Sequence, residues 1–174
     1  MSDANMEPGE DATKNTTPRD GKGGARLSRR RAARLGAVQA LYQMEVGQAP
    51  LNEVLAEFAS RRRGPEFEDG QCGNPDHALL EDIVRGVVRN QATVDRAVNR
   101  HLADDWKLPK LDATVRAILR AAGYELLFRE DIPPKVAINE YVALAHAFFG
   151  EADEPKFVNG VLDSLAHEHR AEEL

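Results

Sequence analysis

The chain has 174 residues, 42% of them hydrophobic and 30% charged, which fits one compact soluble domain or two small helical subdomains that share a core. Its single cysteine, Cys72, excludes an internal disulfide framework and a cysteine-based zinc site within one chain. The net charge is −6, and no apolar run approaches the ~20 residues of a membrane helix. Because the N-terminus also lacks a signal-peptide pattern, we expect a cytoplasmic protein.

Residues 1–25 are expected to form a disordered tail. They are rich in Gly, Pro, Asp, Asn and Thr and contain no large apolar residue beyond two methionines. Such a segment buries too little surface to offset the entropy lost on ordering. The GKGG stretch at 21–24 lacks the strand and spacing of a phosphate-binding loop. The predicted organisation is therefore a tail at 1–25, a helical domain at 26–168 and a frayed C-terminus at 169–174.

The first two helices are predicted from apolar residues that recur at helical spacing. Ser28 is a plausible N-cap, and Gly47 a natural stop, for a helix with Leu35, Val38, Leu41 and Tyr42 on its apolar face. A second helix is expected at 51–62, followed by a loop at 64–75 that is rich in Gly and acidic residues.

The middle of the chain predicts a long helix and a connector. Asp76 is the expected N-cap of a helix that reaches about His101, with Gly86 and Asn90 as weak points that allow two consecutive helices. Residues 102–110 form the connector, and Trp106 is expected to pin it to the core.

Local sequence signals divide the C-terminal part into three predicted helices. Asp112 starts a helix that the DIPPK stretch at 131–135 ends, and Pro134 suits the first turn of the next helix, which runs to Gly150 with Phe148 inside. A last helix is expected from about Pro155 to about His167. Since no segment alternates like a strand bounded by hairpin turns, we predict an all-α fold.

Five arginines and no acidic residue lie within residues 26–34, the arginine-rich segment. Positive charge near a helix N-terminus is locally destabilising, so an anionic partner explains the pattern better than helix stability does. Arginine binds phosphate bidentately and stacks on bases, which favours a nucleic acid. A solvated basic face paired with acidic side chains of the same chain, a nuclear-localisation signal and a membrane-surface patch remain alternatives.

Three stretches, taken in order and spacing, resemble the NusB family. They are RRRAARLGAVQALYQMEV at 29–46, VRAILRAAGYELLFREDIPPKVAINEYVALAHAFFG at 115–150 and KFVNGVLDSLA at 156–166. The resemblance covers roughly residues 26–168. It implies an all-helical bundle of two packed three-helix subdomains.

The resemblance also implies a function and its partners. It implies a transcription antitermination factor that binds boxA-type single-stranded RNA, notably in leader transcripts of ribosomal RNA operons. It implies a heterodimer with the ribosomal protein NusE, and entry into the RNA polymerase complex with NusA and NusG. None of these partners follows from composition or periodicity.

The family's RNA-contacting segments correspond to two groups of residues in this chain. The arginine-rich segment supplies Arg29, Arg30, Arg31 and Arg34, and the KFVNG stretch supplies Lys156, Phe157 and Asn159. The residue types agree, since lysine binds phosphate, phenylalanine stacks on bases and asparagine reads a base edge. Core packing of Phe157 and a local helix role for Asn159 are the structural alternatives.

No catalytic or cofactor motif accompanies these segments. The chain has no dinucleotide fingerprint, no nucleophile elbow and no HExxH, so we expect neither an enzyme, nor a cofactor, nor a metal. A NusB-like domain also occurs fused to a ribosomal-RNA cytosine methyltransferase, so a regulatory fragment of such an enzyme is one alternative. A helical interaction module without sequence-specific RNA binding is the other.

Overall fold

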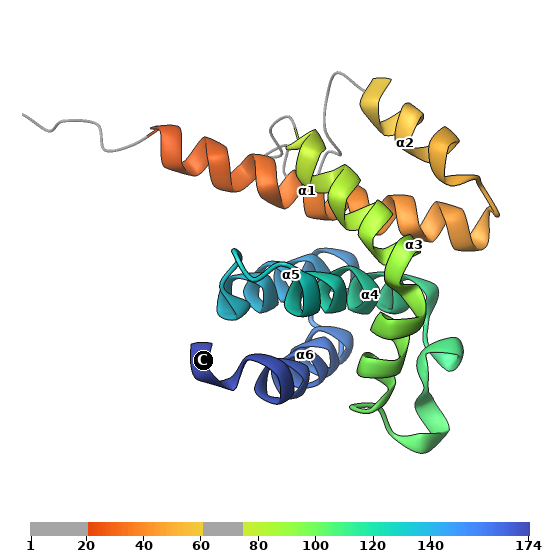
Figure 1. The fold of residues 1–174 in the computed structure, drawn as a ribbon, viewed down its shortest axis with the longest axis vertical. Coiled ribbons are helices and arrows are strands. Elements are labelled where there is room, and N and C mark those ends of the chain that lie inside the picture. The colour runs from red at the N-terminus through yellow and green to blue at the C-terminus, as the bar shows by residue number, and fades with distance from the viewer. Residues whose placement is uncertain (1–20, 61–74) are drawn as a thin grey trace, which may run out of the picture.

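The computed structural model of the chain describes residues 21–60 and 75–174 (Figure 1). These ranges contain helices and no strand, which confirms the all-α prediction for the described part of the chain. The α-helices are α1 (Gly21–Val46), α2 (Leu51–Ser60), α3 (His77–Asn99), α4 (Ala113–Phe128), α5 (Pro134–Phe149) and α6 (Glu154–Arg170). Three single-turn 3-10 helices accompany them: η1 (Asp104–Trp106), η2 (Leu108–Lys110) and η3 (Ala171–Glu173).

Helix α4 lies at the centre of the bundle and packs against α1, α3, α5 and α6 (Figure 1). Its sequence explains this position, because small and apolar residues surround most of its circumference and are buried from Val115 to Leu126. A helix whose apolar residues cover most of its circumference is packed into a core. The groups α1–α3 and α4–α6 correspond to the two expected three-helix subdomains. They are packed together and share one continuous hydrophobic core.

Local signals in the sequence set several helix ends. The Asp76 side chain accepts a hydrogen bond from Leu79 N, and Asp112 accepts from Thr114 N and Val115 N, so both predicted N-caps are confirmed. Pro134 occupies the first turn of α5, as expected. Asn90 departs from helical geometry at φ −116° and ψ 19°, which marks the predicted weak point of α3.

The start of the first helix differs from the prediction. Helix α1 begins at Gly21, so Ser28 lies inside the helix and does not cap it, and residues 21–25 are helical. The prediction failed because three glycines in this stretch are poor helix formers, whereas the alanine, leucine and arginines after them are good ones. The rest of the predicted tail, the end of the second helix and the predicted loop up to residue 74 lie outside the described residues.

The connector after α3 packs differently from the prediction. Trp106 does not pin it to the core, because its side chain remains 59% exposed. Leu108 takes that position and is buried. The backbone N–H of Leu108 also donates a 2.9 Å hydrogen bond to the side-chain oxygen of Asn99, which ties the connector to the end of α3.

The C-terminal residues are ordered rather than frayed. Helix α6 continues to Arg170, and η3 follows it. The buried Arg170 guanidinium donates to the carbonyl oxygens of Glu130 and Ile132 at 3.2 and 2.9 Å and pairs with Glu173. These bonds satisfy backbone carbonyls in the α4–α5 loop, and this is why the segment is held in place.

Among the helices of the described ranges, none has the length and apolar character needed to cross a membrane.

Candidate nucleic-acid interface

Arg29 and Arg30 lie in the N-terminal half of α1 and are exposed. The Arg29 carbonyl accepts a 3.0 Å hydrogen bond from Asp76 N, which fixes this part of α1 beside the start of α3. Arg129 donates hydrogen bonds to Asp131 and lowers the pKa of that carboxyl to about 2, and the charge of Arg30 acts in the same direction. The two exposed arginines therefore lie between the start of α3 and the α4–α5 loop.

Arg31 is partly engaged within the molecule. Its guanidinium donates two hydrogen bonds of 3.0 Å to the Glu140 carboxylate on α5. The Arg31 side chain is nevertheless about half exposed, whereas Glu140 is largely covered. The pair links α1 to α5.

Arg34 does not belong to the exposed face that the sequence predicted, because its side chain is only 2% exposed. Its Nε and one terminal nitrogen donate to both oxygens of Glu125 on α4, at 2.8 to 3.2 Å. The helical repeat explains this, since Val38 and Leu41 follow Arg34 by four and seven residues and are also buried. The spacing from Arg34 to Val38 and Leu41 in the sequence already indicates this register, whereas the charge of Arg34 alone predicts exposure.

A third side chain completes this buried cluster. The Tyr141 hydroxyl of α5 donates to Glu125, so Arg34, Glu125 and Tyr141 join α1, α4 and α5. Burial disfavours the charged form of Arg34, but the hydrogen bonds and charge of Glu125 outweigh it, and the net pKa of Arg34 is raised. Burial and the nearby Glu125 charge raise the pKa of Tyr141 well above its usual value. Arg34 and Tyr141 therefore remain in their charged and neutral forms, respectively, at neutral pH.

The second predicted group lies at the start of α6. Lys156, Phe157 and Asn159 are all exposed, so Phe157 is not an ordinary core residue. Phe157, 38% exposed, lines an open cavity of about 620 Å³, called here the α6 cavity. Its other lining residues are Trp106, Lys110, Leu111, Asp112, Val115, Asp153 and Glu154.

The structure does not bring the two predicted groups together. The α6 cavity adjoins the start of α4 at Asp112 and Val115. Arg30 instead lies near Asp131, after the end of α4, and Arg31 pairs with the first half of α5. Since α4 has 16 residues and a helix rises 1.5 Å per residue, the two groups are separated by about 24 Å along its axis.

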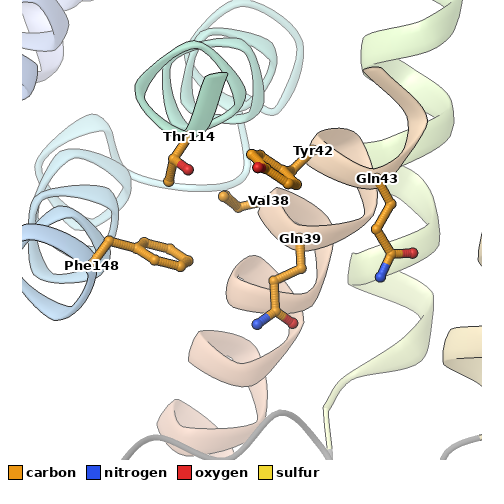
Figure 2. Close-up of a pocket in the computed structure, with 6 residues that line it drawn as sticks. All are labelled: Val38, Gln39, Tyr42, Gln43, Thr114 and Phe148. Carbon is orange, nitrogen blue, oxygen red and sulfur yellow. The ribbon is translucent and has the colours of Figure 1, made fainter. Parts of the chain in front are cut away.

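A second open cavity, of about 430 Å³, lies where α1, α4 and α5 meet (Figure 2). We call it the α1–α5 cavity. It is lined by Val38, Gln39, Tyr42, Gln43, Thr114 and Phe148. Tyr42 and Phe148 had been assigned to the apolar faces of their helices, but each is 40% exposed. Their meeting could not be predicted, because they lie more than a hundred residues apart in the sequence.

The interface offers charge and aromatic surface. No cluster of three or more His, Cys, Asp or Glu side chains suitable for a metal ion occurs among residues 21–60 and 75–174. Exposed arginines, a lysine and three half-exposed aromatic rings suit the binding of phosphates and unpaired bases.

Comparison with known proteins places the chain in a family. Residues 31–167 match the NusB family. The transcription antitermination protein NusB of Caulobacter vibrioides is 47% identical over 147 residues, covering 84% of this chain and 98% of that protein. The protein of the same name from Maricaulis maris is 50% identical over 145 residues, covering 83% and 90% of the two chains.

Solved structures agree with this assignment. A structure of T. maritima NusB is 33% identical and superposes with a TM-score of 0.67, covering 82% of this chain and 94% of that chain. A crystal structure of the antitermination factors NusB and NusE in complex with double-stranded RNA contains a chain of the same fold. That chain is 23% identical, with a TM-score of 0.62 and coverage of 79% and 96%. The match over residues 31–167, together with relatives about half identical in sequence, shows that this chain belongs to the NusB family.

Proposed function

We propose that this chain is a transcription antitermination factor that binds boxA-type single-stranded RNA together with NusE. In this role it joins the elongating RNA polymerase complex with NusA and NusG and supports ribosomal RNA transcription in the cytoplasm. Relatives about half identical in sequence are named transcription antitermination proteins, and a structural neighbour is a NusB–NusE complex with double-stranded RNA. The observation that carries the proposal is the pair of exposed arginines, Arg29 and Arg30, on a chain with net charge −6.

The described geometry supports different RNA contacts for the two groups of residues. Arg29 and Arg30 position the RNA through phosphates, and the half-exposed Arg31 adds to the positive charge beside them. Lys156, Phe157 and Asn159 contact a phosphate, stack on a base and read a base edge at the other end of α4. The burial of Arg34 gives it a supporting role instead of an RNA contact. The proposed role breaks no bond and needs no cofactor.

The proposal is tested by fluorescence anisotropy with a labelled boxA-like RNA, a scrambled RNA and a duplex of the boxA-like sequence, each with and without NusE. We expect preferential binding of the single-stranded boxA-like RNA that tightens with NusE. By linkage, RNA must tighten NusE binding by the same factor. Equal or absent binding of all three RNAs, with NusE present, favours the alternative of a helical interaction module without sequence-specific RNA binding.

The arginines are tested by single substitutions. Arg30→Ala should weaken RNA binding and reduce the slope of log affinity against log salt by roughly 0.7 for the lost phosphate contact. Arg96→Ala is the matched control, because Arg96 is an equally exposed helical arginine on α3. Unchanged affinity and slope for Arg30→Ala, with an unchanged circular-dichroism spectrum, contradict the assignment.

A further inference from the structure

Helix α3 and its C-cap carry four arginines on one side, called here the α3 arginine stripe: Arg85, Arg89, Arg96 and Arg100. We propose that the α3 arginine stripe binds the phosphates of the RNA that flanks the boxA-like element. The inference rests on the proposed function and extends the RNA-binding surface beyond its two groups of contacts. It assigns an electrostatic contact and no reading of bases.

The four side chains line up because of their spacing. Arg85 and Arg89 are four residues apart, as are Arg96 and Arg100, and residues four apart share a helix face. The two pairs are offset by eleven residues, close to three full turns, so they lie on the same side of α3 on either side of the distortion at Asn90. At a rise of 1.5 Å per residue, the stripe is about 22 Å long.

The centre of the stripe is exposed and is not neutralised within the described part of the chain. Arg89 and Arg96 are exposed, and neither forms an ion pair with any residue of 21–60 or 75–174. The acidic side chain between them, Asp95, is largely covered and accepts two hydrogen bonds of 2.9 Å from Arg120 of α4. On a chain with a net charge of −6, this part of α3 therefore presents positive charge to solvent.

The two ends of the stripe are paired with carboxylates at the surface. Arg85 lies 2.8 Å from Glu81 on the same helix, and Arg100 lies 3.0 Å from Glu168 of α6. These four side chains are between 37% and 54% exposed, and exposed ion pairs are weak. Phosphates can therefore compete with both carboxylates for the guanidinium groups.

The stripe begins beside the arginines that are proposed to position the boxA-like RNA. The backbone N–H of Asp76 donates to the Arg29 carbonyl oxygen at 3.0 Å. Arg85 follows Asp76 by nine residues, about 14 Å along α3. Figure 1 shows α3 crossing α1 and continuing beyond it. RNA that leaves Arg29 and Arg30 on this side therefore meets Arg85 first.

The stripe leads away from the second group of proposed RNA contacts. Its far end pairs with Glu168 near the C-terminus of α6, whereas the α6 cavity with Phe157 lies at the start of that helix. Phe157 and Glu168 are eleven residues apart, about 17 Å along α6. An element that extends from Arg30 to Phe157 therefore does not follow α3, and RNA outside this element reaches the stripe. Arg96→Ala for this reason remains a suitable control for the boxA-like RNA alone.

The composition of α3 favours a phosphate backbone as the occupant. All four cations are arginines, whose planar guanidinium binds phosphate bidentately. Helix α3 contains no Phe, Tyr or Trp, so it has no aromatic ring on which a base could stack. Binding at the stripe should therefore depend on salt and not on RNA sequence.

The test uses the full chain with NusE and a labelled boxA-like RNA that has no tail, or a 5′ or 3′ tail of about ten uridines. We expect one of the two tails to tighten binding to the wild-type chain. In the double variant Arg89→Ala/Arg96→Ala, this tailed RNA should bind about tenfold more weakly. Its slope of log affinity against log salt should fall by roughly 1.4, at about 0.7 for each lost contact. The RNA without a tail should bind both proteins equally.

Three further variants test whether charge causes the effect. Arg89→Lys/Arg96→Lys keeps both charges and should retain most of the effect of the tail. Glu81→Gln removes the carboxylate paired with Arg85, so it should tighten binding of the tailed RNA. Glu53→Gln makes the same charge change at an exposed position of α2 and is the matched control. Unchanged circular-dichroism spectra and Tm values exclude loss of the fold as the cause.

The outcomes separate this inference from the proposed function. If neither tail tightens wild-type binding, or if its advantage survives in Arg89→Ala/Arg96→Ala, the flanking-RNA site is overturned while a preference for boxA-like over scrambled RNA still stands. If polyglutamate binds the wild-type chain but not this variant, and neither tail has an effect, the stripe serves an acidic protein and the proposal is also overturned. If boxA-like and scrambled RNA bind equally while the effect of the tail still depends on Arg89 and Arg96, the proposed function fails and the stripe stands.

Discussion

Arg34, although part of a run of basic residues, stabilises the fold through its buried ion pair with Glu125. Removing one partner of a buried ion pair leaves an uncompensated charge, so Arg34→Met should lower the free energy of unfolding by about 3–5 kcal/mol. Urea denaturation followed by circular dichroism measures this change. Arg85→Met is the control, because Arg85 forms an exposed pair with Glu81 four residues away and should cost under about 1 kcal/mol. Equal losses for the two variants contradict the structural role of Arg34.

Asp131 makes a prediction at acid pH. Its folded pKa is about 2, because Arg129 hydrogen-bonds its carboxylate. An unfolded aspartate has a pKa of about 3.9, so the folded value is depressed and the stabilisation is present above about pH 4. It is lost as the pH falls through about 2. Because the Arg129–Asp131 pair is exposed, we expect the free energy of unfolding of the wild-type chain to exceed that of Asp131→Asn by only about 0.2–1 kcal/mol at pH 5.5. Urea unfolding should show this difference fading toward pH 2, and a constant difference would contradict the assignment.

Two helical glycines make opposite predictions at the scale of the elements. A Cβ on Gly86 of α3 would lie 2.2 Å from the Tyr124 ring, so Gly86→Ala should destabilise by about 1–3 kcal/mol through overpacking between α3 and α4. A Cβ on Gly160 of α6 meets nothing within 4 Å, so Gly160→Ala should stabilise by about 0.5–1 kcal/mol. Thermal unfolding of both variants checks the signs. A stabilised Gly160→Ala that binds RNA less tightly would indicate a close approach of RNA to the α6 backbone.

The elements that the sequence predicted correctly depend on short-range chemistry. Asp76, Asp112 and Pro134 act within their own first turn, so each is recognisable without knowledge of the rest of the fold. The roles predicted for Trp106 and for the segment 169–174 were wrong because they depend on how the chain packs. Trp106 remains exposed because Leu108 fills the core, and Arg170 is buried because the α4–α5 loop presents carbonyls to it.

In the candidate site, too, the features visible in the local sequence were predicted, and those that need distant residues to meet were not. Arg29, Arg30 and Arg31 are visible as a run of charge, but the pairing of Arg31 with Glu140 and of Arg34 with Glu125 joins residues about a hundred positions apart. The α1–α5 cavity likewise needs Tyr42 and Phe148 to meet. No local pattern encodes such meetings, because they result from the packing of α1 and α5 against α4 and against each other.

At the scale of the whole molecule, the proposed RNA path predicts a change in tryptophan fluorescence at the α6 cavity. Trp106 is the one tryptophan of the chain, and it lines the α6 cavity beside Phe157. An RNA that reaches from the arginines to this cavity should change its fluorescence, because base stacking alters the surroundings of an exposed indole. Titration with a boxA-like RNA and with a shortened version of it measures this effect. We expect a change only with the longer RNA, and Arg30→Ala should require more RNA for the same change.

The arginine-rich segment also makes the charge distribution of the molecule uneven. Residues 26–34 hold five arginines while the whole chain has a net charge of −6. Arg31 and Arg34 are paired with Glu140 and Glu125, so Arg29 and Arg30 concentrate exposed positive charge in the first half of α1 on an otherwise acidic chain. Such a charge distribution has a large dipole moment, which turns the basic end toward an approaching polyanion before contact. The association rate with RNA should therefore fall steeply as salt rises, while the dissociation rate changes less. Stopped-flow mixing at several ionic strengths distinguishes these two rates, and Arg29→Ala should flatten the salt dependence of the first.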